Sequence, residues 1–129
     1  MQVLERLAVI FLGGCVGGYT RYAVTQAWST PTYGFPWPTF TVNIIGAFVL
    51  GVVLVIATRG ERSHRFRLLV GTGFCGALTT FGSVVVAVDE LLAHHHVATA
   101  LVYLVVTTVA ALLVTTVSVS VTRRVAARW

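Results

Sequence analysis

A run of 21 uncharged residues, 68–88, constrains the fold of this chain more than any other feature. As a helix it is long enough to cross the ~30 Å apolar core of a lipid bilayer. It nevertheless contains four glycines and a pair of threonines, Thr79 and Thr80, where a simple spanning helix would carry Leu, Ile and Val. Because glycine weakens a helix, the sequence predicts a membrane helix that is interrupted between Gly76 and Thr80 and leaves backbone carbonyls without their helical donors. Interrupted helices are tolerated in hydrocarbon only where protein or a polar pathway contacts them, and they mark ion sites.

The composition places the chain in a lipid bilayer as a single domain. Of its 129 residues, 57% are hydrophobic and 10% are charged, whereas soluble domains average about a quarter charged residues. All nine basic residues are arginines, and they cluster between the apolar runs. The excess of basic over acidic residues therefore indicates membrane topology and not nucleic-acid binding. The first apolar run continues past Gly18, so it is expected to be retained as a span and not cleaved as a signal peptide.

Four apolar runs predict an all-α membrane protein with four transmembrane helices per subunit, in one domain of residues 1–129. Residues 29–37 contain two prolines and three aromatic residues, which suits a turn-rich link in the membrane interface. Residues 59–67 contain four arginines and one acid, and they are expected to form a charged loop. The spans are expected at about residues 4–28, 38–58, 68–90 and 97–121.

Most polar residues inside the spans allow two interpretations. Arg21, near the end of the first span, either snorkels to the headgroups or faces an aqueous vestibule. Asn43 must find hydrogen-bond partners in an apolar span, and it either bonds to another helix or donates to a permeating ion. Tyr103 and Thr107 share one helix face, where their hydroxyls either bond across helices or form a polar track. For the overlapping GxxxG patterns of residues 13–18, close helix packing is favoured.

Three other patterns resemble functional motifs but are not interpreted as functional sites. Residues 71–76 match the dinucleotide-binding pattern G-x-G-x-x-G, but they lie in an apolar span after an arginine-rich segment and not between a strand and a helix. The histidines of residues 94–96 are consecutive and do not share a helix face, so a solvated interfacial turn is favoured over a metal site. Cys15 and Cys75 both lie in apolar spans, where buried free thiols are expected and not a disulfide or a metal pair.

Four motifs occur in the four spans in order. They are Gly13-Gly14-x-x-Gly17-x-x-x-Arg21-Tyr22, Thr41-Val42-Asn43-x-x-Gly46, Gly73-Phe74-Cys75-Gly76-x-Leu78-Thr79-Thr80-Phe81, and Tyr103 with Thr107. Together they resemble the Fluc (CrcB-type) fluoride channels over nearly the whole chain. The third-span motif is highly specific, whereas the other three are weak when taken alone.

The resemblance implies a channel that exports cytoplasmic fluoride passively across the cell membrane and so reduces fluoride toxicity. It implies an antiparallel dimer of four-helix subunits. It also implies a structural sodium ion, not transported, that is held by backbone carbonyls at the third-span interruption; the matching residues here are Gly76 and Thr79. Two facing interruptions would together offer enough oxygens for one hard cation.

The resemblance also places a fluoride pathway beside the sodium ion. Asn43 matches the family's pore asparagine, Phe81 its first pore phenylalanine, and Thr107 a serine of its polar track. A pore for a small hydrated anion must replace the hydrogen-bond donors of water. Amide N–H groups and hydroxyls can donate, and a phenylalanine ring offers a positive edge. The further candidate donors are the hydroxyls of Thr80, Ser83 and Tyr103.

One departure from the family pattern affects the expected pathway. The second pore phenylalanine is replaced by Val84, and Gly82 replaces a polar residue. The ring-edge relay is therefore incomplete in any pore that uses this position. An alternative function follows, in which the chain is a non-conducting or half-functional partner subunit of a heterodimeric fluoride channel.

The distribution of arginines predicts the orientation of the chain. With four spans, the N-terminus, residues 59–67 and the C-terminus share one side of the membrane. That side holds eight arginines and the other holds Arg21 alone, which should fix both termini in the cytoplasm. A chain that paired with itself in antiparallel fashion would need near balance, so an oppositely oriented homologue is the favoured partner. The eight are Arg6, Arg59, Arg62, Arg65, Arg67, Arg123, Arg124 and Arg128.

Two other classes of protein are not expected. A small multidrug exporter needs an acid within the membrane to couple protons to cationic drugs. The acids of this chain, Glu5, Glu61, Asp89 and Glu90, lie at span ends or in a loop. An enzyme is not expected either, because His, Ser, Cys and acidic residues do not gather at a common depth.

Overall fold

A computed structural model describes residues 2–57 and 60–128, without the side chains of residues 60–62. Within these residues all regular secondary structure is helical, as predicted, and there is no strand. Four helical stretches are long and apolar enough to cross a membrane: Val3–Ala27, Trp37–Ile56, Ser63–Ala93 and Val97–Ala126. The elements are α1 (Val3–Ala27), α2 (Trp37–Ile56), α3 (Gly60–Phe66), the π-helix η1 (Arg67–Cys75), α4 (Gly76–Leu78), α5 (Phe81–Ala93) and α6 (Val97–Ala126).

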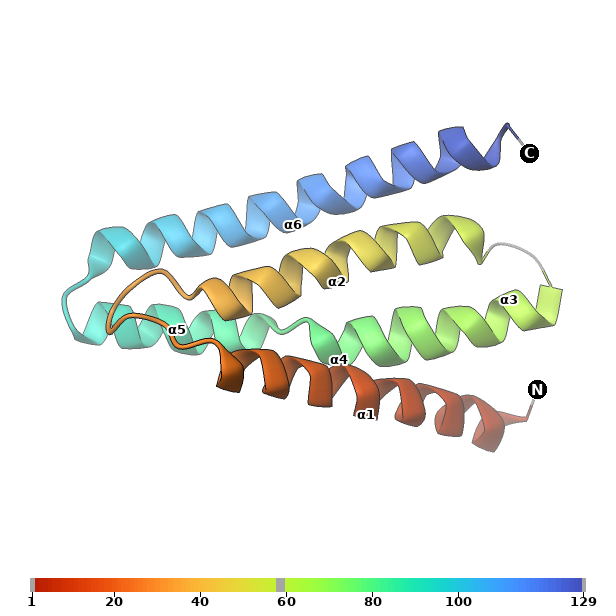
Figure 1. Cartoon of the computed structure of the whole chain (residues 1–129), viewed down its shortest axis with the longest axis horizontal. Helices are drawn as coiled ribbons and strands as arrows, with labels where there is room; N and C mark the ends of the chain where they lie inside the picture. Colours follow the sequence, from red (N-terminus) through yellow and green to blue (C-terminus); the bar gives the residue numbers. More distant parts are fainter. Residues whose placement is uncertain (1, 58–59, 129) are drawn as a thin grey trace.

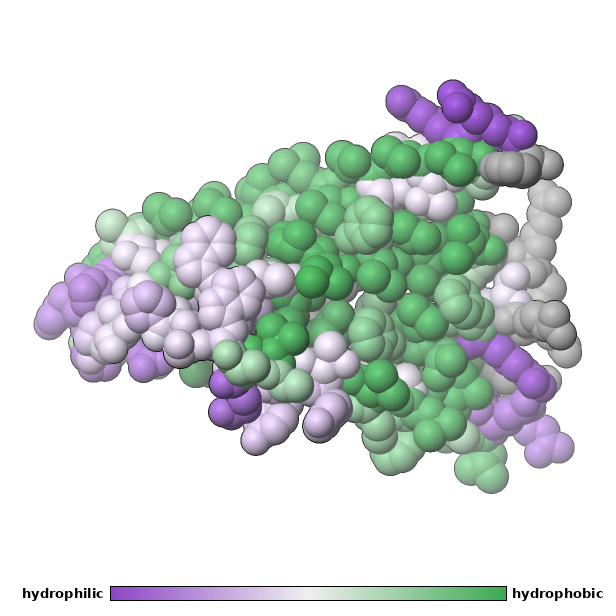
Figure 2. All heavy atoms as spheres, viewed as in Figure 1, coloured by the Kyte–Doolittle hydropathy of each residue, from purple (hydrophilic) through white to green (hydrophobic). Residues whose placement is uncertain are grey.

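The four long helical stretches lie side by side along one direction (Figure 1). Both ends of the chain and α3 lie at one end of the bundle, and the α5–α6 turn lies at the other. Apolar side chains cover most of the surface between the two ends, and hydrophilic residues gather at the ends (Figure 2). Large apolar side chains such as Phe11, Leu12 and Phe48 are more than half exposed. This surface suits a multi-pass membrane protein, since lipid tails can cover it.

Close packing between α1 and η1 depends on glycine. A β-carbon at Gly13 would overlap the carbonyl oxygen of Leu69, and one at Gly17 would overlap the carbonyl oxygen of Phe74. The backbones of the two helices therefore touch, as small residues allow in membranes. Gly18, by contrast, has open space around the position of a β-carbon. The packing interpretation of the GxxxG patterns is confirmed for Gly13 and Gly17.

Helix α2 lies at the centre of the bundle and uses glycines in the same way. It begins with Trp37 and Pro38, and the missing N–H of proline costs nothing in a first turn. A β-carbon at Gly46 would overlap the methyl group of Thr79, and one at Gly51 would overlap the hydroxyl of Ser118 on α6. The two glycines thus leave space for side chains of the third helical stretch and of α6.

The prediction of a charged loop over residues 59–67 is wrong for the described part of that segment. Gly60–Phe66 forms α3, which runs directly into η1. After Gly60 this segment contains neither Gly nor Pro, and arginine is a good helix former. Arg65 also forms an ion pair with Glu5 of α1, which holds α3 against the first helix. Arg59 lies outside the described residues, and so does Thr58, the predicted end of the second span.

The third and fourth helical stretches are longer than expected at their polar ends. The third begins before residue 68 and ends at Ala93, and α6 continues past residue 121 to Ala126. The turn predicted for residues 94–96 is present, and His95 has a positive φ of 63°. The ring of Tyr33 contacts those of His94 and His96, with centroid distances of 4.3 Å and 5.0 Å.

The two cysteines differ in their surroundings. Cys75 is buried, as predicted, but Cys15 is exposed, so that prediction is wrong for Cys15. The reason is that Gly13 and Gly17 face η1, which leaves Cys15 and Val16 on the outer side of α1. Both thiols are free.

Candidate functional site

The third helical stretch is interrupted at Thr79 and Thr80. α4 ends at Leu78 and α5 begins at Phe81. Thr79 has φ −79° and ψ 147°, and Thr80 has φ −150° and ψ 117°, so both are extended. The ribbon leaves its helical path between α4 and α5 (Figure 1). The backbone groups around these two residues therefore need partners other than those of a regular helix.

A π-helix leads into the interruption. η1 covers Arg67–Cys75 and contains Gly71 and Gly73, both buried. π-helical segments are rare, usually span a single turn, and often occur at functional sites. The sequence predicts a weakened helix here but not its wider winding. The dense glycines were the only available signal, and they do not distinguish a π-helix from a plain break.

Hydrogen bonds at the interruption are redistributed. The N–H and the hydroxyl of Thr79 both donate to the carbonyl of Cys75, at 3.0 Å and 2.9 Å. In an uninterrupted helix the N–H of Thr80 would donate to the carbonyl of Gly76. Here it donates instead to Oδ1 of Asn43, at 2.8 Å. The carbonyl of Gly76 has thus lost its regular helical donor.

Asn43 connects α2 to the interruption through both ends of its amide. Its side chain is 7% exposed. Besides accepting from the N–H of Thr80, it donates from Nδ2 to the carbonyl of Thr80 at 3.2 Å. A primary amide carries two N–H bonds, so one remains for another acceptor. Of the two interpretations of Asn43, the interhelical hydrogen bond is present in the structure.

Two of the predicted fluoride donors form the N-terminal cap of α5. The hydroxyl of Thr80 accepts from the N–H of Ser83 at 3.1 Å and donates to the hydroxyl of Ser83 at 3.2 Å. A threonine in this position satisfies a free N–H of the first helical turn. The cap fixes the start of α5 directly after the interruption.

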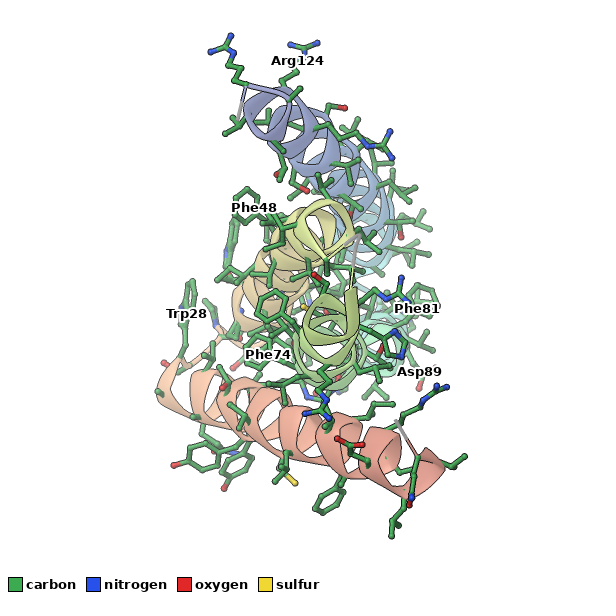
Figure 3. All side chains as sticks on the ribbon, turned by 90° about the vertical axis from the view of Figure 1, so that its right-hand side faces the viewer. Trp28, Phe48, Phe74, Phe81, Asp89 and Arg124 are labelled. Atoms are coloured by element: carbon green, nitrogen blue, oxygen red, sulfur yellow. The ribbon has the colours of Figure 1, made fainter. Side chains whose placement is uncertain are left out.

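An open groove of about 310 Å³ runs between α2, α5 and α6 and brings several predicted residues together. We call it the central groove. Phe81 stands at its edge with 65% of its surface exposed, and it projects from the flank of the bundle (Figure 3). Ser83 and Tyr103 are not among the lining residues. The lining residues are Asn43, Ala47, Leu50, Thr79, Thr80, Phe81, Val84, Thr107, Thr108, Ala111, Leu112 and Thr115.

The hydroxyls of Tyr103 and Thr107 are buried and have no hydrogen-bond partner among the described residues. Tyr103 is 0% exposed, and its ring meets that of Phe35 edge-on at 5.1 Å. Thr107 is 4% exposed and lines the central groove. Buried polar groups are normally paired, so an unpaired hydroxyl at a groove is a candidate ligand for an ion.

The remaining predicted residues lie elsewhere. Gly76 lines a second groove of about 480 Å³ between α1 and the η1–α4 segment, together with Gly14 and Cys15. The two residues predicted to hold sodium, Gly76 and Thr79, therefore line different grooves of the single chain. Arg21 lies on α1 and lines neither groove.

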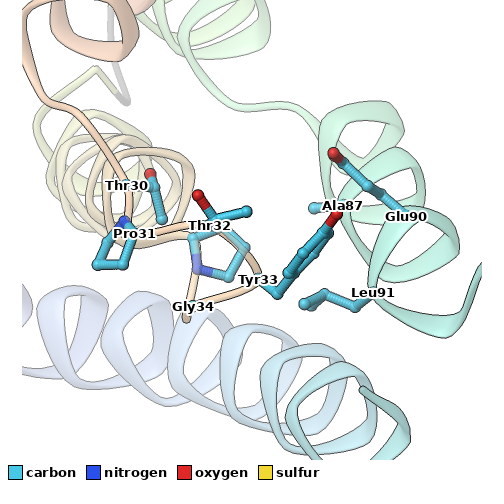
Figure 4. Close-up of a pocket in the computed structure, with 9 residues that line it drawn as sticks. Thr30, Pro31, Thr32, Tyr33, Gly34, Ala87, Glu90 and Leu91 are labelled. Carbon is cyan, nitrogen blue, oxygen red and sulfur yellow. The ribbon is translucent and has the colours of Figure 1, made fainter. Parts of the chain in front are cut away.

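A third hollow, of about 350 Å³, lies at the end of the bundle opposite the termini. Tyr33, from the link after α1, extends there toward Ala87 and Glu90 of α5 (Figure 4). None of the predicted site residues lines it. It belongs to the packing of the α1–α2 link against α5.

The fold and the site define a class of protein: a multi-pass helical membrane protein whose third helix is interrupted beside an open groove lined by Asn43 and several threonines. More specifically, the chain belongs to the CrcB family, because the family model described as "CrcB-like protein, Camphor Resistance (CrcB)" matches residues 8–119.

Individual relatives carry a functional name. The "Fluoride-specific ion channel FluC 1" of Mycolicibacterium paratuberculosis is 40% identical over 125 residues, which are 96% of this chain and 95% of that protein. The "Fluoride-specific ion channel FluC 2" of Streptomyces avermitilis is 44% identical over 99 residues, 76% of this chain and 63% of that protein. The match thus spans less than two thirds of the Streptomyces relative. "Fluoride-specific ion channel FluC" of Methanococcus aeolicus is 41% identical over 80 residues, 62% of this chain and 64% of that protein.

Proposed function

We propose that this chain is a subunit of a fluoride-selective channel that lets cytoplasmic fluoride leave the cell passively and so reduces its toxicity. The observation that carries the proposal is the 40% identity to a relative named as a fluoride-specific ion channel, over 96% of this chain. Because the match covers nearly the whole chain, it includes the interrupted helix and the residues that line the central groove. The activity is ion transport and not catalysis.

The chemistry of the central groove is consistent with an anion pathway. Fluoride gives up water only where other donors replace it. Thr107 offers a buried hydroxyl that has no partner among the described residues, and Asn43 retains one N–H. Phe81 is exposed and can turn a positive ring edge toward an anion without adding a fixed charge. These three residues are the core of the proposed pathway, with Thr80, Ser83, Tyr103 and the vestibule residue Arg21 as further members.

We also propose a structural sodium ion at the interruption, where the backbone offers oxygen ligands. Sodium is a hard cation that prefers oxygen ligands, and the carbonyl of Gly76 has lost its helical donor to Asn43. We propose that the carbonyls of Gly76 and Thr79 hold the ion, which would supply a fixed positive charge beside an anion pathway. Two carbonyls are too few for a hard cation, so a second subunit is needed to complete the set.

The partner is proposed to be an antiparallel second subunit. The central groove is open, and the exposed apolar side chains of the single chain leave room for a dimer interface. The arginine bias favours an oppositely oriented homologue over a second copy, with both termini of this chain in the cytoplasm and the dimer in the cell membrane. Streptomyces avermitilis has relatives named both FluC 2 and FluC 3, so more than one such chain occurs in one organism.

Reconstitution in liposomes tests the function. Fluoride efflux is followed with an ion-selective electrode, first with this chain alone and then together with a homologue from the same genome. Rapid efflux of fluoride without efflux of chloride is expected in at least one of the two preparations. Equal efflux of the two halides, or no fluoride efflux from either preparation, would refute the proposal.

A second candidate function is a partner subunit that is only half functional. The observation that favours it is Val84, which is 1% exposed and aliphatic where the family pattern has a second pore phenylalanine. The liposome experiment separates the two functions. Efflux from the mixed preparation alone supports the partner subunit, and efflux from this chain alone supports a self-sufficient channel.

A further inference from the structure

We infer that Asn43 is the positioning residue of the cation site, because it takes the N–H of Thr80 away from the carbonyl of Gly76 and so keeps that carbonyl free to bind a hard cation. The inference rests on the proposed function, since it concerns the same interruption. It assigns to Asn43 a role distinct from donating to fluoride, and it makes the cation site depend on α2, which contributes no proposed ligand.

The hydrogen bonds at Thr80 carry the inference. A helix that continued through the interruption would pair the N–H of Thr80 with the carbonyl of Gly76. The acceptor in the structure is Oδ1 of Asn43 at 2.8 Å, and Nδ2 of the same amide donates to the carbonyl of Thr80 at 3.2 Å. Asn43 therefore occupies both backbone polar groups of one residue, as a neighbouring β-strand would. This two-point contact favours the extended conformation of Thr80.

Without Asn43, the N–H of Thr80 would need another acceptor in an apolar environment. The nearest one along the chain is the carbonyl of Gly76, four residues earlier in the helical register. Forming that bond would draw Thr80 toward the helix and occupy the carbonyl that the cation needs. The choice between the extended and the helical state therefore depends on a single buried amide.

The packing of α2 supports the same assignment. Gly46 lies three residues after Asn43, on the same face of α2. It leaves the space that the methyl group of Thr79 fills. One face of α2 thus contacts both extended residues, Thr80 through hydrogen bonds and Thr79 through van der Waals contact. Helix α2 therefore stabilises the extended conformation of Thr79 and Thr80.

Two substitutions at Asn43 separate positioning from ion conduction. Asn43→Leu has a similar volume but no acceptor for the N–H of Thr80. Asn43→Asp keeps the acceptor for the N–H of Thr80, which is the bond that the inference needs, but it loses the donor to the carbonyl of Thr80 and puts a negative charge beside the proposed fluoride pathway. Ser118→Ala is the matched control, because its buried hydroxyl lies between α6 and α2, away from the interruption, and donates only to the carbonyl of Thr115.

Sodium binding to the purified assembled channel is the first measurement. The increase in Tm is followed as sodium replaces N-methylglucamine at constant ionic strength. Asn43→Leu is expected to raise the half-saturating sodium concentration by about tenfold or more, the usual effect of losing a residue that positions metal ligands. Asn43→Asp and Ser118→Ala are expected to keep the response to sodium, and Asn43→Asp is expected to lose fluoride efflux nevertheless.

The carbonyl of Gly76 can be observed directly. The chain has two Gly–Ala pairs, at residues 46–47 and 76–77. Labelling glycine with ¹³C at the carbonyl and alanine with ¹⁵N therefore leaves two cross-peaks in the NMR spectrum. One of the two is expected to move when sodium is added to the wild type. It is expected to move without sodium in Asn43→Leu, because its carbonyl gains a hydrogen bond, while the other peak stays in place.

The results separate the inference from the proposed function. Unchanged sodium affinity in Asn43→Leu, or an unchanged pair of Gly–Ala peaks in that variant, would overturn the inference. A wild type that conducts fluoride but shows no response to sodium would also overturn it and leave the channel function standing. Sodium binding that depends on Asn43 in a protein that passes no fluoride would support the inference and refute the proposed function.

Discussion

Phe81 and Val84 lie one turn apart on α5 and both line the central groove, yet their exposure is opposite: 65% for Phe81 and 1% for Val84. Phe81 stands at the open edge of the groove, where a second subunit or an ion can reach it. Val84 is covered by the rest of the same chain, and α5 packs against α6. Val84, at the position where the family resemblance implies a second pore phenylalanine, is therefore closed in this subunit.

Val84→Phe is predicted to destabilise the protein instead of restoring a ring-lined pore. A ring is much larger than an isopropyl group, and overpacking a closed site typically costs about 1–3 kcal/mol. Thermal unfolding in detergent should show a lower Tm. Val84→Ile, which adds one methylene, should cause a smaller decrease. A Val84→Phe variant with wild-type Tm and increased fluoride efflux would show that this position opens in the assembled channel.

Phe81→Ile is predicted to slow fluoride efflux with little effect on folding. The ring is mostly exposed in the single chain, so its loss removes few internal contacts. If the contact of the ring edge with the anion is worth as much as an aromatic pair, about 0.5–1.5 kcal/mol, its loss corresponds to a decrease in efflux of up to about tenfold. Efflux from liposomes and Tm should be measured on the same preparation. A large decrease in Tm with unchanged efflux would assign Phe81 to the packing of the dimer.

The sequence predicted those parts of the fold that depend on local composition. The lengths of the apolar runs were sufficient for the four membrane helices. Glycines next to hydroxyls pointed to the region where Thr79 and Thr80 leave the helix. The GxxxG patterns predicted close packing, and Gly13 and Gly17 provide it against η1. Each of these signals is short-range in the sequence.

The parts that the sequence could not predict depend on contacts between distant residues. Asn43 and Thr80 are 37 residues apart, and nothing in the pattern around Asn43 identifies its partner. The pair of Glu5 with Arg65 links a residue that was expected at a span end to one that was expected in a loop, and it accompanies a helix where that loop was predicted. The cap formed by Thr80 and Ser83 uses hydroxyls that were predicted to serve the ion.

Gly13→Ala is predicted to weaken the contact between α1 and η1. The added methyl group would overlap the carbonyl oxygen of Leu69, and the two backbones would have to separate. The expected loss of stability is about 1–3 kcal/mol. Gly18→Ala is the matched control on the same helix, because a β-carbon there meets open space and alanine favours the helix. Tm should decrease for Gly13→Ala and stay equal or increase for Gly18→Ala; the reverse order would contradict the packing.

The chain is predicted to insert with one orientation only, with both termini in the cytoplasm. Arg6 near the start of α1, Arg65 in α3 and Arg67 at the start of η1 belong to segments at the end of the bundle that also holds both termini. The arginines after residue 122 lie at the same end, and among the described residues Arg21, near the end of α1, is the single arginine of the opposite half. Positively charged residues near span ends keep those ends in the cytoplasm. A green fluorescent protein fused to the C-terminus should therefore fluoresce, whereas alkaline phosphatase fused there should be inactive.

The control for the predicted orientation is a variant in which the difference in arginine number between the two sides of the membrane is smaller. Replacing Arg123, Arg124 and Arg128 with glutamine removes three positive charges, two in the last turn of α6 and one after it. Part of the population should then insert the other way and activate the phosphatase fusion, because orientation follows the difference in positive charge between the two sides. Equal activity of the two reporters on the unmodified chain would show that it inserts in both orientations. An antiparallel pair could then form from one gene, and the proposed need for an oppositely oriented homologue would be lost.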